Sequence, residues 1–138
     1  MAFKGYYLKF IKGEESWKLP LKYMYVDSWN ASPLKVQDLD PYYDADGLLH
    51  RNPVPHTSAD LKFSTPPMFM NQKEEFMSKI RSMMTNTLRR DMTIEFYNDE
   101  TGEYETADFY MVEPEFNGSK NTNKGILYNS ITFEFIKY

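Results

Sequence analysis

The chain has 138 residues and no cysteine, and its 16 Lys and Arg against 20 Asp and Glu give a net charge of −4. This length matches one domain, and the lack of cysteine excludes disulfides, cysteine-ligated zinc, iron–sulfur clusters and thiol catalysis. The acidic balance disfavours binding to nucleic-acid phosphates, and the apolar stretches are far shorter than the ~20 residues that cross a bilayer.

Aromatic residues make up 17 % of the chain, with eleven Tyr, ten Phe and two Trp beside nine Met. These residue types are enriched at the centres of protein–protein interfaces and also suit the faces of β-sheets. The first ten residues mix lysines with aromatics, which is not the pattern of a secretory signal, so the mature chain is expected to begin at Met1.

Two early strands are expected at residues 3–11 and 21–29, because both segments are rich in aromatic and β-branched residues and flank a turn-like interval at residues 13–16. The periodicity then disappears from Ala31 to His56, where prolines and aspartates predict one long loop. Loops of that length in a small domain are usually functional or disordered. The apolar residues of this loop favour an ordered segment, because they provide side chains with which the loop can pack.

Alternation over residues 58–65 predicts a half-buried strand, which Pro66 and Pro67 end. A helix is expected at residues 72–84, with Asn71 as its N-cap and Glu74 completing a capping box. Its apolar stripe of Phe76, Met77, Ile80, Met83 and Met84 is best explained as core.

The clearest hairpin is predicted at residues 91–111, where two alternating segments flank a turn that contains Asp99 and Gly102. A polar loop at residues 117–125 is expected to precede a final long strand at residues 126–138. The fold class that follows is mainly β with one α-helix, as a single domain over residues 1–138. We expect an antiparallel β-sandwich or barrel of about six or seven strands, with the helix packed on it and one long, ordered loop.

No motif assigns catalytic, cofactor or metal residues. The acidic run from Asp38 to Gly47 resembles part of a calcium loop, but aligning Gly47 with the sixth position places Tyr42 at the first and Pro53 at the twelfth, where carboxylates are needed. The aspartates are therefore expected to accept local backbone hydrogen bonds. His50 and His56 match neither a helical metal pair nor a known triad order, and the glycines form no phosphate-binding loop.

A family resemblance rests on the order of several turn and strand motifs. Asp46-Gly47-Leu48-Leu49-His50-Arg51-Asn52-Pro53 is followed by Asp60-Leu61-Lys62-Phe63, a helix, Tyr97-Asn98-Asp99-Glu100-Thr101-Gly102 and a closing Ile131-Thr132-Phe133-Glu134-Phe135. From Trp29 to Tyr138 this order resembles small proteins from tail-gene regions of bacteriophages that infect Gram-positive bacteria. Together with the strand and helix order, it looks like the tail-tube fold of tube, tube-adaptor and baseplate-hub proteins.

The resemblance implies a virion tail protein, made in the bacterial host cytoplasm, that forms rings of its own copies and contacts other tail proteins without an enzymatic activity, a cofactor or specific nucleic-acid binding. A carbohydrate- or receptor-binding β-sandwich is the alternative, because exposed Trp and Tyr can stack on sugars. The predicted intersubunit contacts lie in or beside the long loop: Leu34, Tyr42, Tyr43, Leu48, Leu49, His50, Arg51 and His56.

Overall fold

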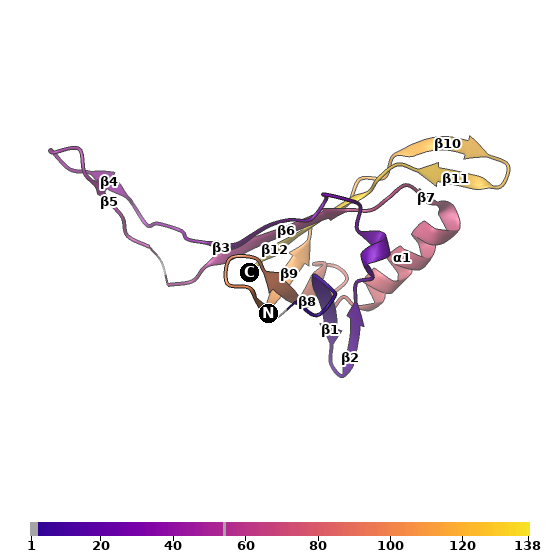
Figure 1. Cartoon of the computed structure of the whole chain (residues 1–138), viewed down its shortest axis with the longest axis horizontal. Helices are drawn as coiled ribbons and strands as arrows, with labels where there is room; N and C mark the ends of the chain where they lie inside the picture. The colour runs from indigo at the N-terminus through magenta and orange to yellow at the C-terminus, as the bar shows by residue number, and fades with distance from the viewer. Residues whose placement is uncertain (1–2, 54) are drawn as a thin grey trace.

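The computed structural model describes residues 3–53 and 55–138, and across them the chain is mainly β-sheet with a single α-helix (Figure 1). The elements in chain order are β1 (Leu8–Lys12), β2 (Glu15–Lys18), the 3-10 turn η1 (Leu21–Tyr23), β3 (Asn30–Lys35), β4 (Tyr42–Tyr43), β5 (Leu49–His50), β6 (Ser58–Ser64), β7 (Met68–Phe69), α1 (Met70–Ser82), β8 (Asp91–Asn98), β9 (Glu103–Met111), β10 (Gly118–Thr122), β11 (Gly125–Tyr128) and β12 (Thr132–Lys137).

The main sheet has seven strands in the order β2-β1-β8-β9-β12-β6-β3, and every neighbouring pair is antiparallel. A three-stranded sheet, β10-β11-β7, and a two-stranded sheet, β4-β5, complete the β-structure. The prediction of a mainly antiparallel β fold with one helix is therefore confirmed. The hairpin predicted at residues 91–111 is also confirmed, since β8 and β9 pair from Asp91↔Tyr110 to Asn98↔Glu103.

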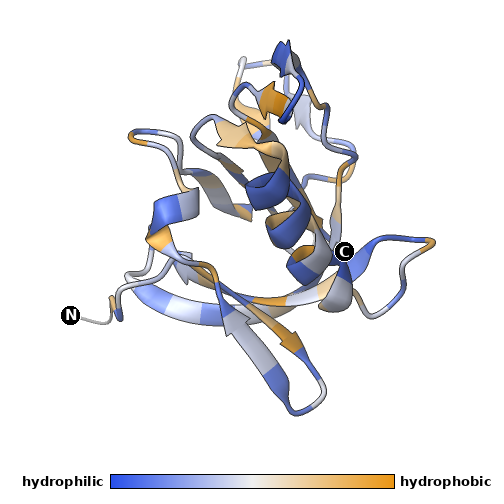
Figure 2. Ribbon diagram, turned by 90° about the vertical axis from the view of Figure 1, so that its right-hand side faces the viewer, coloured by the Kyte–Doolittle hydropathy of each residue, from blue (hydrophilic) through white to orange (hydrophobic). Residues whose placement is uncertain are grey.

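The core lies on one face of the main sheet, where the alternating residues of the strands meet helix α1. Phe63 stacks on Phe133 with ring centroids 5.4 Å apart, and Phe76 of the helix meets Phe133 edge-on at 5.3 Å. Figure 2, viewed along the long axis, shows the polar outer turns of the helix and the residue-by-residue change of hydropathy along the strands. The apolar stripe predicted on the helix accordingly supplies core residues, with Phe76 and Ile80 buried.

The partner of the first strand differs from the prediction. β1 turns at Gly13, which has a φ of +60°, and pairs at once with Glu15–Lys18, so that residues 21–29 are not a strand. Pro20 begins a 3-10 turn instead, and Val26 is 79 % exposed. The apolar composition of residues 21–29 was misleading because only part of that segment reaches the core.

Two further boundaries differ. The helix runs from Met70 to Ser82, so it begins and ends two residues before the predicted bounds. β7 leads directly into it, and the backbone N–H of Phe69 donates to Gln72 Oε1 over 3.3 Å, so the predicted Asn71 and Glu74 capping box does not form. The final strand is divided in two, since β11 pairs with β10 and β7 in the small sheet while β12 lies between β9 and β6. The predicted polar loop at residues 117–125 is largely β10 and its turn.

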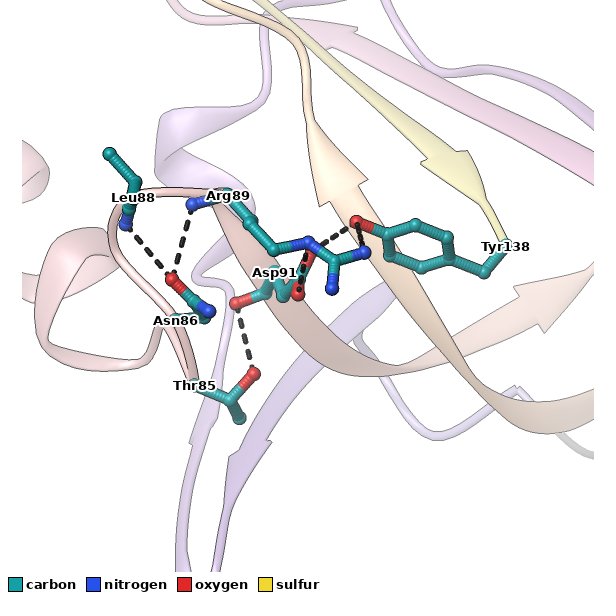
Figure 3. A network of polar contacts seen from close by, with 6 residues as sticks. All are labelled: Thr85, Asn86, Leu88, Arg89, Asp91 and Tyr138. Atoms are coloured by element: carbon teal, nitrogen blue, oxygen red, sulfur yellow. Dashed lines mark hydrogen bonds and ion pairs between the residues drawn. The ribbon is translucent and has the colours of Figure 1, made fainter.

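The C-terminal residue is held against the start of β8 by a polar network (Figure 3). The Tyr138 hydroxyl donates to Asp91, which raises the pKa of Tyr138, and Arg89 Nη2 donates to the same hydroxyl over 3.2 Å. Asn86 Oδ1 accepts from the backbone N–H groups of Leu88 and Arg89 over 3.1 and 3.2 Å, which fixes the preceding turn. The network ties the end of the chain to a strand 47 residues earlier.

A buried threonine joins β6 to β12, and its removal tests how strongly this contact stabilises the sheet. Thr65 is 0 % exposed, and its Oγ1 accepts from the backbone N–H of Ile131 over 3.2 Å. We expect Thr65→Val to lower the free energy of unfolding by about 1–3 kcal/mol, because a buried N–H then loses its acceptor. Urea unfolding measures the change, and Ser58→Ala, half-buried at the start of β6, should stay within about 0.5 kcal/mol. Equal effects of the two substitutions would contradict this prediction.

A second prediction concerns the buried Tyr6 hydroxyl, which donates to Glu95 Oε1 over 2.6 Å. Burial and this hydrogen bond raise the pKa of Tyr6 from 10.0 to about 12. The folded state therefore holds the proton more tightly than the unfolded state, so the stabilisation is complete below about pH 10 and is lost as the pH rises towards about 12. We expect the free energy of unfolding to fall by about 1–2 kcal/mol over this window.

The measurement is denaturant unfolding at about pH 9 and about pH 11.5, for the parent and for Tyr6→Phe. The comparison separates the effect of Tyr6 from that of nearby charged groups, such as Lys18, whose Nζ lies 5.1 Å from the Tyr6 ring centroid. The pH dependence should be flatter in Tyr6→Phe. An identical loss of stability in both proteins would show that other groups cause it.

Candidate assembly interface

The predicted long loop is a strand followed by a projecting hairpin. Asn30–Lys35 forms β3 at the edge of the main sheet, with Ala31 opposite Leu61 of β6. Residues 36–53, here called the arm, then leave the sheet and contain the paired strands β4 and β5. Figure 1 shows the arm projecting from one end of the molecule, while the hairpin of β10 and β11 lies at the opposite end.

The arm is stiffened along its length by contacts between its two sides. Near the base, the backbone N–H of Leu39 donates to the carbonyl of Asn52 over 2.8 Å. The Arg51 guanidinium donates to both carboxylate oxygens of Asp38, from Nε over 3.2 and 3.1 Å and from Nη2 over 2.8 Å, and this pairing raises the pKa of Arg51. Further out, the rings of Tyr42 and His50 stack with centroids 4.8 Å apart.

Asp44 organises the turn at the tip. Its Oδ1 accepts from the backbone N–H groups of Asp46 and Leu48 over 2.9 and 3.0 Å, and its Oδ2 lies 2.7 Å from His50 Nε2. The hydrogen bond from His50, followed by those from the backbone, lowers the pKa of Asp44. Gly47 occupies the left-handed region at φ +80°, which completes the turn. This carboxylate accepts local hydrogen bonds, as the sequence predicted.

The apolar side chains of the arm are exposed in the single chain. Tyr43 is 71 % exposed and Leu48 is 64 % exposed, although both are large enough to bury substantial area. Exposed apolar side chains grouped on one segment are typical of interaction surfaces. The large hydrophobic residues that share this exposure are Val36, Leu39, Tyr42, Tyr43, Leu48 and Leu49.

The structure divides the eight predicted interface residues between the arm and its base. Six of them lie in the arm: Tyr42, Tyr43, Leu48, Leu49, His50 and Arg51. Leu34 is instead half-buried in β3, beside a hollow that Thr57 and Ala107 also line. His56 lies at the base, where its Nε2 is 2.7 Å from the carbonyl oxygen of Tyr138. The two histidines therefore have different partners and form no common site.

Sequence reasoning did not find a groove between β2, η1 and the helix. Trp17 and Tyr23 line it together with Phe76, and its volume is about 480 Å³, within the ~300–1,000 Å³ typical of ligand pockets. Lys22 and Lys79 provide its cations and Glu75 its carboxylate. The helical spacing of Glu75 and Lys79 was visible in the sequence, but the position of Trp17 beside them depends on the β1–β2 hairpin.

Across residues 3–53 and 55–138, no three His, Asp or Glu side chains are placed to hold a metal ion. In the same residues no helix has the length and apolar character needed to span a membrane. The side chains gathered at the arm and the groove are aromatic, aliphatic and charged, which suits binding to a protein surface.

These features describe an elongated, mainly antiparallel β-protein with a stiff, apolar projecting arm. The chain belongs to the family described as "Family of unknown function (DUF6711)", whose model matches residues 1–138. No curated protein matches the sequence.

Among solved structures, the chain is similar to a protein chain in the tail of an empty GTA particle, a structure with C6 symmetry. The two are 10 % identical, with a TM-score of 0.55, over 100 % of this chain and 94 % of the other. A chain in the anti-feeding prophage cap, the AFP tube terminating cap, matches at 16 % identity and a TM-score of 0.39, over 99 % of this chain and 87 % of the other. The first likeness shows a shared fold across nearly the whole of both chains.

Proposed function

We propose that this protein is a non-enzymatic structural subunit of a virion tail, where it forms rings with copies of itself and contacts other tail proteins. The observation that carries the proposal is the exposed apolar arm on a fold shared with a chain from the tail of a GTA particle. A stiff arm with unburied aromatic side chains favours association, because little conformational entropy is lost when it docks. The C6 symmetry of that particle's tail makes six subunits the expected ring size.

In this proposal the arm side chains contact a neighbouring subunit, while Leu34 and His56 hold the base of the arm on the sheet. Tyr42, Tyr43 and Leu48 supply the apolar contacts. The net charge of −4 fits a protein that does not retain nucleic acid on its surface. The subunit is made in the host cytoplasm and resides in the virion tail.

The experiment is to induce particles from the strain that encodes the chain, purify them, and locate the protein by mass spectrometry and by gold-labelled antibody. The proposal expects the protein in tail fractions, label on the tail, and rings in electron micrographs of concentrated recombinant protein. Its absence from particles that carry all their other structural proteins would overturn the proposal. Measurement of the free protein by size-exclusion chromatography with light scattering gives its state before assembly.

A further inference from the structure

We propose that the groove lined by Trp17, Tyr23 and Lys79 is the receptor for the arm of a second copy of this chain. This inference rests on the proposed function and identifies the surface that the arm contacts. The arm and the groove are two different surfaces of one chain, so their contact is head-to-tail. A head-to-tail contact produces closed rings or open stacks, according to the rotation between successive copies.

The side chains of the arm match the chemistry of the groove. The arm presents exposed tyrosine and leucine side chains, and the groove offers the half-buried rings of Trp17 and Tyr23, which pack on the buried Phe76. Aromatic rings in contact favour offset or edge-on packing, as Trp17 and Phe76 already show with centroids 6.0 Å apart. The groove volume of about 480 Å³ is in the range of small-molecule pockets, so the groove has room for arm side chains such as tyrosine and leucine.

Charge complementarity selects the arm as the occupant. The four aspartates and one arginine of residues 36–53 together carry a charge of −3. The groove carries Lys22 and Lys79 against the single carboxylate of Glu75. At its end, Lys12 Nζ donates to the carbonyl of Ser82 over 3.3 Å, which adds a further cation to the rim. Opposite charges on the two surfaces steer association and fix its register.

Deletion experiments cannot show that the arm contacts the groove, because loss of either surface alone would prevent assembly. The absence of native cysteine allows a direct contact test, since one introduced cysteine is the only thiol in its chain. Ala45→Cys places a thiol in the turn at the tip of the arm, and Ser78→Cys places one in the lining of the groove. Both substitutions are small and lie at exposed positions.

The two variants, as full-length chains with different affinity tags, are mixed, concentrated and oxidised. We expect a disulfide-linked heterodimer in about tenfold higher yield than the mixture of Ala45→Cys with Ser119→Cys, because docking raises the effective concentration of the two thiols. Ser119 is the matched control, an exposed serine in β10 of the small sheet. The yield should fall as the salt concentration rises, because screening weakens the contact between arm and groove.

The outcomes separate this inference from the proposed function. Rings in the micrographs with equal cross-linking at Ser78 and Ser119 overturn the groove as the receptor and leave the tail role standing. If no rings form and cross-linking at Ser78 does not exceed that at Ser119, the contact between arm and groove is overturned and self-assembly is also contradicted. Binding of an added oligosaccharide to the parent protein that is lost in Trp17→Ala, with no heterodimer above control, assigns the groove to a glycan and also overturns the inference.

Discussion

Removal of residues 131–138 is expected to unfold the domain. These residues contain β12, which lies between β9 and β6, so their loss separates β6 and β3 from the rest of the main sheet. Ile131, Phe133 and Phe135 are each 0 % exposed. Truncation of large core side chains costs about 2–5 kcal/mol each, against a typical total stability of about 5–15 kcal/mol. Circular dichroism should show no cooperative thermal transition.

Two single substitutions in β12 provide a matched pair for the same prediction. Phe133→Ala should lower the free energy of unfolding by about 3–5 kcal/mol, because it leaves a cavity where Phe63 and Phe76 now pack. Glu134→Ala, on the opposite face, should change it by no more than about 0.5 kcal/mol. If the truncated chain instead melts cooperatively near the parent midpoint, the hydrophobic core is complete without β12 and the prediction is wrong.

The core face of β12 was predictable because its alternation is strict. Ile131, Phe133 and Phe135 recur at the two-residue period of a strand, and the structure buries all three. The same logic located the β8–β9 hairpin, where alternation and a Gly-containing turn agree. These are elements in which local pattern and tertiary burial give the same answer.

The elements that the sequence missed lack this agreement. β10 has the sequence Gly-Ser-Lys-Asn-Thr and is exposed throughout, so it has no alternation to detect, and its pairing with β11 supplies the reason for its extended form. Residues 21–29 are apolar enough for a strand, but Pro20 begins a 3-10 turn there. The groove also could not be predicted from local sequence patterns, because it brings Trp17 beside a helix far along the chain.

The arm was recognised from its prolines, its length and its unplaced apolar residues, and its hairpin form was not. β4 and β5 have two residues each, too few for a periodicity to appear. Their pairing depends on the turn around Asp44, whose carboxylate accepts from the backbone N–H of Leu48. It also depends on the ion pair of Asp38 with Arg51, whose side chains are 13 residues apart. Charged and polar residues thus hold the arm in shape and leave its apolar side chains exposed.

Deletion of residues 38–49 is expected to abolish assembly and leave a folded domain. None of these residues is buried, and the main sheet continues through β3 and β6 without them. The thermal midpoint should therefore stay close to that of the parent, while rings and incorporation into particles disappear. Anchor residues of an interface typically contribute about 2 kcal/mol or more each, so loss of several removes the contact. Sedimentation velocity and electron microscopy measure assembly, and circular dichroism measures folding.

A double substitution separates the arm's side chains from its length. Tyr43→Ser with Leu48→Ser keeps the hairpin, since the hydrogen bonds at the tip are made by Asp44 and by backbone groups. We expect this variant to weaken assembly by at least tenfold, because two exposed apolar anchors lose their buried area on docking. Glu103→Ser with Thr101→Ser, at the exposed β8–β9 turn, is the matched control and should assemble normally. If the deletion variant still forms rings and enters particles at the parent level, the arm is not an assembly surface, and the contacts between subunits lie elsewhere on the chain.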